Sequence, residues 1–458
     1  MKWTLAEASA AVGGQLSGAH TASVIFNSVT TDSRAMTAGQ LFVALRGERF
    51  DGHDFLGDAQ QAGVAAALIS RREAVPPGLP VIEVSDTRLA LGSLAAAWRR
   101  RFSIPLIGIT GSNGKTTTKE MVAAILRAAF GPAVLATQGN LNNDIGLPLT
   151  LLRMTPEDRA AVIEMGMNHP GEIDYLAALA SPTAAVVTNA QRAHLEGMGD
   201  LAEIAREKGS LYRHLSPHGV AAIVQGQAFT PLWTAQAAGH AMLTFGETPD
   251  CTVQAQITEK GFETLLSLKT PQGHCDIPLK IPGLHNARNA LAAAAVCLAA
   301  EVPLAAIQSG LSLFAGVPGR LEKSLLPKGI SLLDDSYNAN PDSVRAGIDV
   351  LAQAPGAKIL VLGDMGEIGS EGMALHREVG AYAQAAGVNR LLTLGNAARE
   401  ASAAFGSGGT HFESLEQLLP VLQASLLPRS TVLVKGSRFM RMEKVCQALR
   451  ESLTVVRG

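Results

Sequence analysis

The stretch GITGSNGKTTTKE (residues 108–120) combines glycines, a lysine and threonines in a spacing that can hold a phosphate. Glycines let backbone N–H groups converge on phosphate oxygens, and a helix that begins directly after them adds positive potential. Lys115 can reach the outer phosphates of a nucleotide, and Thr116 can offer its hydroxyl to Mg²⁺. The strict G-x-x-x-x-G-K-[ST] pattern requires glycine at position 109, where this chain has isoleucine. The alternative, a glycine turn with a capping threonine, is disfavoured by the flanking strand and helix patterns.

Three further side chains could act beside a phosphate loop, and the residues alone leave other roles open for each. Glu164 ends the apolar strand AAVIEM, where a carboxylate can face a metal ion held by the loop or can simply be solvated. His194 follows the strand VVTN, in a loop where a lone histidine is more often structural or exposed. Lys208 lies in the helical segment AEIAREKGSLY, and by itself it is interpreted as a surface lysine.

The elements that must position these residues alternate in a way that predicts a parallel sheet with crossover helices. The apolar run PLIGIT feeds the glycine loop, and AAVIEM, AAVVTN and VAAIV follow it, separated by helical patterns. Residues 251–281 instead predict antiparallel strands with turns at KG and PQG, before the alanine-rich helix NARNALAAAAVCLAA. FAGVPGR (314–320) is interpreted as a hinge. After it, strands ISLLDD, KILVLGD, RLLTLG and TVLVKG alternate with helices and lack a G-x-G-x-x-G fingerprint.

Length and composition predict a globular α/β protein of three domains. The chain has 458 residues, with 47% hydrophobic and 17% charged residues, which is too long for one core and shows no sign of disorder. The stiff stretch VPPGLP (75–80) indicates the first boundary. We predict a small mixed α/β N-terminal domain at residues 1–82, a central P-loop-type mononucleotide-binding α/β domain with an antiparallel addition at 83–314, and a C-terminal Rossmann-like α/β domain at 315–458.

Charge and cysteine usage argue against several other classes of protein. The formal net charge is -2 and aromatic residues make up 4%, whereas a nucleic-acid binder more often has a basic field with stacking aromatics. The cysteines contain no C-x-x-C pair or zinc-type spacing and are interpreted as reduced structural thiols. The N-terminal stretch lacks an apolar signal region, and the longest apolar run, LAAAAVCLAA, is too short for a membrane span. We therefore expect a cytoplasmic protein without nucleic-acid binding or membrane insertion.

The motifs together resemble the Mur ligases of peptidoglycan synthesis, which share T-G-x-N-G-K-T-T, a strand-end glutamate and A-H-L-E. The resemblance spans all three predicted domains. Within the family, four stretches favour the member that joins D-alanyl-D-alanine to UDP-N-acetylmuramoyl-tripeptide: TDSRAMTAGQLFVALRGERFDGHDF (31–55), EMGMNHPGEI (164–173), DDSYNANPDS (334–343) and LGDMGEIG (362–369). The implied reaction is ATP-dependent amide formation through an acyl phosphate.

The resemblance implies catalytic and metal-binding roles for individual residues. Lys115 is similar to the family's phosphate lysine, Thr116 and Glu164 to ligands of one Mg²⁺, and His194 to a ligand of a second. Lys208 matches a lysine that the family carbamylates. Addition of CO₂ to a neutral amine turns a potential cation into an anion that can bind Mg²⁺.

The resemblance also implies contacts to ATP and to the substrates. The implied ATP contacts are Thr110, Gly111, Ser112, Asn113, Gly114, Lys115, Thr116, Thr117, Asn289 at the adenine, and Arg320, Asp335 and Tyr337 from the closing C-terminal domain. The implied substrate contacts are Ser33 and Arg34 at the UDP moiety, and Thr137, Asn140, Asn142 and Asn143 at the sugar peptide. On the residues alone, the asparagines could equally form a turn, and the C-terminal residues could serve interdomain packing.

Other interpretations predict different behaviour. The chain departs from the family pattern at Met198 and Asp200, where a bulky residue and Ser or Thr are more usual. A sister Mur ligase or a folylpolyglutamate synthetase would add a single amino acid. A nucleotide-dependent switch or kinase would turn over ATP without forming an amide, and it would leave TDSR, AHLE and Lys208 unexplained. We expect a monomer.

Overall fold

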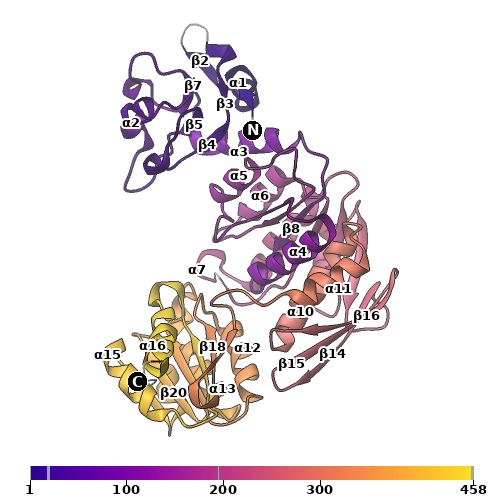
Figure 1. Ribbon diagram of the computed structural model, residues 1–458, viewed down its shortest axis with the longest axis vertical. Coiled ribbons are helices and arrows are strands. Elements are labelled where there is room, and N and C mark those ends of the chain that lie inside the picture. Colours follow the sequence, from indigo (N-terminus) through magenta and orange to yellow (C-terminus); the bar gives the residue numbers. More distant parts are fainter. Residues whose placement is uncertain (1, 18–20, 194, 455–458) are drawn as a thin grey trace.

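The chain folds into three α/β units that follow one another along the sequence (Figure 1). The computed structural model describes residues 2–17, 21–193 and 195–454. The N-terminal and C-terminal units lie at opposite ends of a central unit. This arrangement confirms the α/β class and the three-part organisation expected from the sequence. No helix within the described ranges is long and apolar enough to cross a membrane.

The N-terminal unit is built on a small mixed sheet. Within its described residues the strand order is β2-β7-β6-β5-β4, with β2 antiparallel to β7 and the other pairs parallel. The bounds are β2 (Gln15–Ser17), β4 (Ser28–Thr30), β5 (Gln40–Val43), β6 (Ala66–Ile69) and β7 (Val81–Glu83), with the pair β1 (Trp3–Thr4) and β3 (Ile25–Phe26) and the helices α1 (Leu5–Val12) and α2 (Leu56–Gln61). Because β7 pairs with β6, the strand after the proline-rich loop belongs to this first sheet.

The central unit is built on a larger sheet of order β16-β15-β14-β13-β12-β11-β8-β10-β9 in the described part of the chain. Its strands are β8 (Leu106–Thr110), β9 (Val134–Ala136), β10 (Ala160–Glu164), β11 (Ala184–Val187), β12 (Val220–Val224), β13 (Ala241–Gly246), β14 (Val253–Lys260), β15 (Glu263–Thr270) and β16 (Gly273–Leu279). Strands β9 to β14 and β8 pair in parallel, whereas β15 is antiparallel to both β14 and β16. The predicted antiparallel addition, with its turns at KG and PQG, is confirmed.

Helices cover both faces of this sheet and join it to its neighbours. They are α3 (Thr87–Arg99), α4 (Lys115–Phe130), α5 (Gly146–Leu151), α6 (Glu172–Ala180), α7 (Leu195–Met198), α8 (Leu201–Gly209), α9 (Thr230–Gln236), α10 (Leu284–Ala299) and α11 (Leu304–Leu313). Strand β8 is buried along its whole length and lies between β10 and β11. Its carboxyl end therefore lies on the carboxyl edge of the parallel strands, with a neighbouring strand on each side. Ligands of open parallel sheets bind at such an edge.

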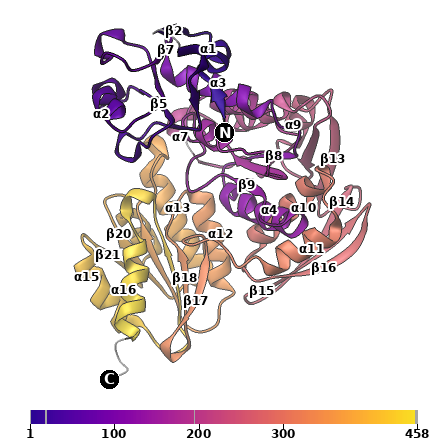
Figure 2. The same cartoon turned by 45° about the horizontal axis from the view of Figure 1, so that its top comes forward.

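The C-terminal unit is a second parallel sheet, of order β17-β18-β22-β19-β20-β21, with β17 antiparallel to β18. Its strands are β17 (Glu322–Leu326), β18 (Ile330–Asp335), β19 (Lys358–Gly363), β20 (Arg390–Leu394), β21 (Gly409–Phe412) and β22 (Thr431–Lys435). Its helices are α12 (Pro341–Ala352), α13 (Gly372–Ala385), α14 (Arg399–Phe405), α15 (Leu415–Ser425) and α16 (Glu443–Thr454). The turned view shows this unit beside the central one, where the short helix η7 (Gly369–Glu371) contacts α7 (Figure 2).

The apolar cores are distributed unevenly among the units. One continuous cluster of buried side chains runs from Trp3 in the N-terminal unit to Phe314 at the end of the central unit. The C-terminal unit has clusters of its own on the two faces of its sheet. Phe262, from the turn between β14 and β15, packs against one of them. The boundary between the central and C-terminal units therefore carries little shared apolar core.

Candidate active site

The predicted phosphate loop joins the carboxyl end of β8 to the N-terminus of α4, as its sequence pattern requires. Gly111 has φ 154° and Gly114 has φ 79°. A Cβ atom at Gly111 would lie 1.8 Å from the hydroxyl oxygen of Thr188, and one at Gly114 would lie 2.2 Å from the side-chain oxygen of Asn289. Only glycine fits at these two positions, because the backbone is tightly packed and has positive φ there. The N–H groups of Ser112 and Asn113 donate to the backbone and side-chain oxygens of Asn189 at 3.0 Å and 2.9 Å.

Lys115 lies half-buried at the first turn of α4, with its side chain folded back over the loop. Its Nζ donates hydrogen bonds to the carbonyl oxygens of Gly111 at 2.6 Å and Ser112 at 3.2 Å. Burial lowers the pKa of Lys115 from its ordinary value, while the negative charge of Glu164 opposes this shift. The lysine is thus held against its own loop, at the wall of a cavity.

A cavity of about 1220 Å³ opens beside the loop, between the central and C-terminal units. The predicted site residues among its lining are Ser112, Asn113, Gly114, Lys115, Thr116, Thr117, Asn140, Asn142, Asn143, Glu164, Asn289, Arg320, Asp335 and Tyr337. Residues from segments more than 200 positions apart in sequence therefore meet around one space. Of the loop residues, Thr110 and Gly111 lie behind this lining, and the buried Thr110 hydroxyl donates to the carbonyl oxygen of Met165 at 2.9 Å.

Glu164 is buried at the end of β10, with 2% of its surface exposed. Its Oε1 accepts a hydrogen bond from Asn142 at 2.8 Å, and its Oε2 has no hydrogen-bond partner among the described residues. Its backbone N–H donates to the hydroxyl oxygen of the buried Thr137 at 3.0 Å, so Thr137 lies behind the cavity wall and holds this strand end. A buried carboxylate oxygen without a partner is the kind of atom that a cation satisfies.

Lys208 is fully buried in α8, and within the described part of the chain its Nζ has no hydrogen-bond partner. Burial places the pKa of Lys208 well below its ordinary value, and the charge of Lys115 lowers it further. The surface position suggested by the residue pattern alone is wrong, because α8 turns this side chain inward. His194 lies outside the described residues.

The asparagine segment and the N-terminal unit hold the remaining predicted substrate contacts. Asn140 and Asn143 both line the cavity from the segment after β9. The side-chain oxygen of Asn143 also accepts from the backbone N–H of Gly146 at 2.8 Å, at the start of α5. Ser33 and Arg34 lie in the short helix η2 (Ser33–Ala35) and do not line the cavity. The exposed guanidinium of Arg34 donates two hydrogen bonds to the Asp32 carboxylate, each at 2.9 Å. These bonds lower the pKa of Asp32 to about 2.

The C-terminal side of the cavity carries a stacked arginine and a buried ion pair. The guanidinium carbon of Arg320 lies 4.2 Å from the ring centre of Tyr337. Asp335 accepts a hydrogen bond from Lys435 at 2.6 Å, and only 3% of the Lys435 surface is exposed. Lys435 is a site residue that was not predicted, although its position at the end of the apolar strand TVLVKG was a usable signal.

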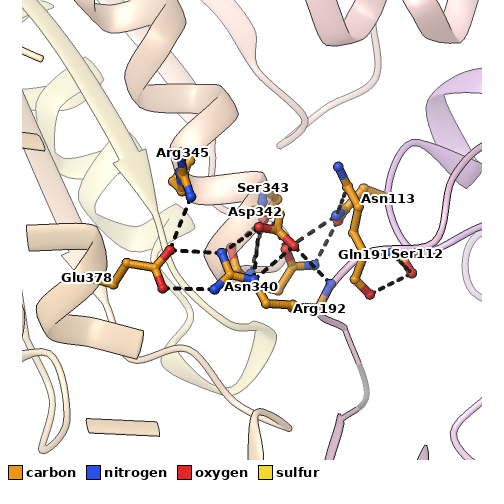
Figure 3. Close-up of polar contacts among 9 residues, drawn as sticks. All are labelled: Ser112, Asn113, Gln191, Arg192, Asn340, Asp342, Ser343, Arg345 and Glu378. Atoms are coloured by element: carbon orange, nitrogen blue, oxygen red, sulfur yellow. Dashed lines mark hydrogen bonds and ion pairs between the residues drawn. The ribbon is translucent and has the colours of Figure 1, made fainter. Parts of the chain in front are cut away.

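Polar contacts also cross the boundary between the two units (Figure 3). Arg192, in the loop after β11, binds Asp342 on α12 and Glu378 on α13, with shortest distances of 2.6 Å and 2.8 Å. Asn113 in the phosphate loop and Asn340 exchange amide hydrogen bonds at 2.7 Å and 3.3 Å. Of these residues, only Asn113 was predicted individually, and Asn340 and Asp342 lie within the quoted stretch DDSYNANPDS. Nothing local in the chain indicates partners so distant in sequence.

Family models match nearly the whole of this architecture. The Mur ligase family catalytic domain matches residues 26–99, the Mur ligase middle domain residues 109–297, and the Mur ligase glutamate ligase domain residues 319–438. The chain belongs to the Mur ligase family. The predicted family is thereby confirmed.

Similar proteins cover the full length of this Mur ligase. The chain is 43% identical to the UDP-N-acetylmuramoyl-tripeptide–D-alanyl-D-alanine ligase of Escherichia coli, over 98% of this chain and 99% of that protein. It is 36% identical to the protein of the same name from Bacillus subtilis, over 99% of both. Its structure matches MurF from Acinetobacter baumannii with a TM-score of 0.92 at 36% identity, covering 98% and 99% of the two chains. It matches MurF from Thermotoga maritima in complex with ADP with a TM-score of 0.83 at 26% identity, covering 94% and 98%.

Proposed function

We propose that this Mur ligase joins D-alanyl-D-alanine to UDP-N-acetylmuramoyl-tripeptide at the expense of ATP, which is converted to ADP and phosphate. The observation that carries this proposal is the similarity over the full chain to ligases named for that reaction. The cavity supports it, because the phosphate loop faces residues of the C-terminal unit across a space that can hold a nucleotide and a second substrate.

The arrangement of the cavity suits an acyl-phosphate route. Amide formation from a carboxylate and an amine is unfavourable in water, so the tripeptide carboxylate first attacks the γ-phosphate of ATP and ADP leaves. The amine of the dipeptide then attacks the acyl carbon, and phosphate leaves. Lys115 orients the transferring phosphoryl group and neutralises part of its charge. Because water would hydrolyse the acyl phosphate, the two units must enclose it.

The residues of the cavity wall fit Mg²⁺. The unpartnered Oε2 of Glu164 and the cavity-lining hydroxyl of Thr116 are oxygen ligands of the type that this ion prefers. When bound, Mg²⁺ screens the repulsion between the phosphates and the attacking carboxylate. We assign Thr116 and Glu164 to one ion. His194 and Lys208 are assigned to a second ion by family resemblance.

Lys208 fits the carbamylation that this assignment requires. A buried amine with a lowered pKa is neutral and can attack CO₂, forming an N–C bond and releasing one proton, which leaves a carbamate anion. The carbamate would satisfy the buried position that the free amine leaves without a partner. A buried carbamate anion is costly unless a cation pairs with it, and the second Mg²⁺ would be that cation.

The remaining site residues follow from the same proposal. Asn289, which backs the phosphate loop, is assigned to adenine, and Arg320, Asp335 and Tyr337 to ATP in the closed enzyme. Ser33 and Arg34 are assigned to the UDP moiety, whose pyrophosphate suits an arginine fork. The limits 1–82, 83–314 and 315–458 remain our proposal for the domains, with the first limit moved past Glu83 because β7 pairs with β6 along its whole length. A monomer remains our prediction.

An assay of phosphate release tests the proposed reaction. Phosphate should appear only when ATP, the UDP-tripeptide and D-alanyl-D-alanine are all present, and the pentapeptide product should appear in equal amount. Free D-alanine should react with kcat/KM lower by several powers of ten, because it lacks the second peptide unit and leaves polar groups of the site unpaired. L-alanyl-L-alanine should also react poorly, because its inverted configuration misplaces the same groups. A preference for a single amino acid would identify a sister ligase instead. Turnover of ATP without amide formation would indicate a switch or kinase.

A further inference from the structure

Arg192 connects the central unit to the C-terminal unit through two carboxylates at once. Its Nε and Nη2 donate to Asp342, its Nη1 and Nη2 donate to Glu378, and its backbone N–H also donates to Asp342 at 2.9 Å (Figure 3). About 27% of the arginine side chain is exposed. Glu378 and Asp342 raise the pKa of Arg192, so the guanidinium stays charged. A paired, partly buried arginine fork of this kind is both directional and stronger than an exposed ion pair.

The same loop is tied directly to the phosphate loop. The backbone N–H of Gln191 donates to the hydroxyl oxygen of Ser112 at 2.9 Å, and the side-chain oxygen of Gln191 accepts from Asn113 at 2.7 Å. Asn113 in turn exchanges hydrogen bonds with Asn340, the N-cap residue of α12. Asp342 lies in the first turn of that helix. The phosphate loop, the loop of Arg192 and the start of α12 therefore form one hydrogen-bonded network.

The charges of this network matter to the nucleotide site. Asp342 lines the same cavity as Lys115. Its carboxylate would repel the phosphates of ATP if no cation neutralised it. Arg192 supplies that cation from the opposite side of the boundary, and it does so only when the two units are together.

We propose that Arg192 is a positioning residue that locks the C-terminal unit onto the loaded phosphate loop and thereby directs the acyl phosphate to the amine instead of to water. This inference rests on the proposed function. Arg192 does not touch the reacting atoms in this account. It acts through Asp342 and Asn340, which set the position of α12 against the phosphate loop.

The test compares Arg192→Gln with Arg345→Gln. Arg345 binds the same Glu378 at 3.2 Å but lies on α12, within the C-terminal unit, so its loss leaves the boundary contacts intact. With all substrates present, we expect Arg192→Gln to form amide about ten- to a hundredfold more slowly. It should also release more than one phosphate per amide formed, whereas wild type and Arg345→Gln should release one. Arg192→Lys keeps the charge but cannot bind both carboxylates at once. Its rate of amide formation and its ratio of phosphate to amide should lie between those of wild type and Arg192→Gln.

The ratio of phosphate to amide distinguishes a lock from a merely structural role. If Arg192→Gln kept a ratio of one with an unchanged kcat, or lost activity only in proportion to the unfolded fraction, the inference would be overturned. If that variant did not fold, the same ratio in a folded Arg192→Lys would decide. Small-angle X-ray scattering with a non-hydrolysable ATP analogue gives a readout that needs no amine. With this analogue, Arg192→Gln should have a larger radius of gyration than wild type. This expectation holds even if the enzyme ligates a different amine, so it tests the lock separately from the proposed function. An equal radius of gyration for both proteins would count against the lock.

Discussion

The two boundaries between the units of this Mur ligase are filled in opposite ways. At the first boundary, Trp98 of α3 packs against Trp3 of the N-terminal unit with ring centres 5.4 Å apart, and its indole N–H donates to the carbonyl oxygen of Met154 in the central unit at 3.0 Å. At the second boundary, a cavity of about 1220 Å³ is bridged by arginine, asparagine and carboxylate side chains. The first boundary is an extension of the core, and the second is a polar cleft.

This difference indicates which unit can move. Burial of apolar surface is lost outright when such a boundary opens, whereas polar groups exchange their contacts for contacts with water at little net cost. The N-terminal unit should therefore stay attached to the central unit, and the C-terminal unit should open and close. A ligase that must admit three substrates and then exclude water needs mobility at the boundary where the phosphates lie. Substitutions at the first boundary should thus change stability, and substitutions at the second should change catalysis.

Lys115→Ala should have the largest effect on catalysis. Because Lys115 lies half-buried at the cavity, its loss should lower kcat/KM by about a thousandfold or more while leaving the melting temperature unchanged. Steady-state kinetics and thermal unfolding of the same preparation test this. Near-normal turnover in a folded variant would refute the role of the phosphate loop.

Lys208→Ala should be nearly inactive and, unlike Lys115→Ala, should be partly rescued by small carboxylates. The alanine variant leaves room for acetate or formate to supply the anion that the carbamate provides in our proposal. Activity titrated against acetate for both variants tests this, with Lys115→Ala as the matched control. Ordinary activity without acetate, or equal rescue of both variants, would contradict the assignment.

The sequence was sufficient to predict most of the fold, because each long buried strand is a continuous apolar run in the sequence. The fully buried strands β8, β10, β11 and β22 coincide with the apolar runs that predicted them. Three strands without such a run were missed. Strand β9 is only three residues long, and β13 and β17 have exposed or alternating positions. The phosphate loop was predictable because its glycines are a local requirement of backbone geometry.

The sequence was much less informative about contacts between distant residues. Lys208 follows Leu201, Ile204 and Ala205 at the i, i+3, i+4, i+7 spacing of one helix face, so its burial had a local signal. That signal was missed because a lysine is rarely fully buried. The partners of Arg192 are 150 and 186 residues away, and no local pattern selects them among the other acidic residues. Family resemblance supplied Lys208, and only the structure supplied Arg192.

Trp98→Ala should be the most damaging substitution at the first boundary. Trp98 is 5% exposed, and its removal from a well-packed site should lower the free energy of unfolding by about 3–5 kcal/mol. The kcat of the molecules that remain folded should stay near that of wild type. Chemical denaturation together with kinetics at low temperature tests both statements. Trp98→Phe keeps most of the packing and should be milder. A folded Trp98→Ala protein with severely reduced kcat would break the division between the two boundaries.

A double-mutant cycle between Asn113 and Asn340 should measure the polar contact across the second boundary. Asn340→Ser keeps a capping side chain for α12 and removes the amide, and Asn113→Ala removes the partner. We expect a coupling of about 0.5–1.5 kcal/mol in kcat/KM for ATP, the usual range for one hydrogen-bonded pair. The same cycle in the free energy of unfolding should give a smaller coupling if the boundary opens before the units unfold. Strictly additive effects on kcat/KM would show that the two asparagines act independently.

Glu7→Gln should have the smallest effect, confined to acid pH. Hydrogen bonds from Thr4, with a further contribution from Arg101, lower the pKa of Glu7 to about 2 in the folded protein. A carboxylate with a lowered pKa stabilises the fold above its unfolded pKa of about 4.3, and this contribution is lost as the pH falls toward 2. Because the pair with Arg101 is largely exposed, we expect less than about 1 kcal/mol. Unfolding free energies of wild type and Glu7→Gln should therefore differ at pH 7 and converge at low pH. A constant difference at every pH would mean that Glu7 acts on the first boundary through packing and not through its charge.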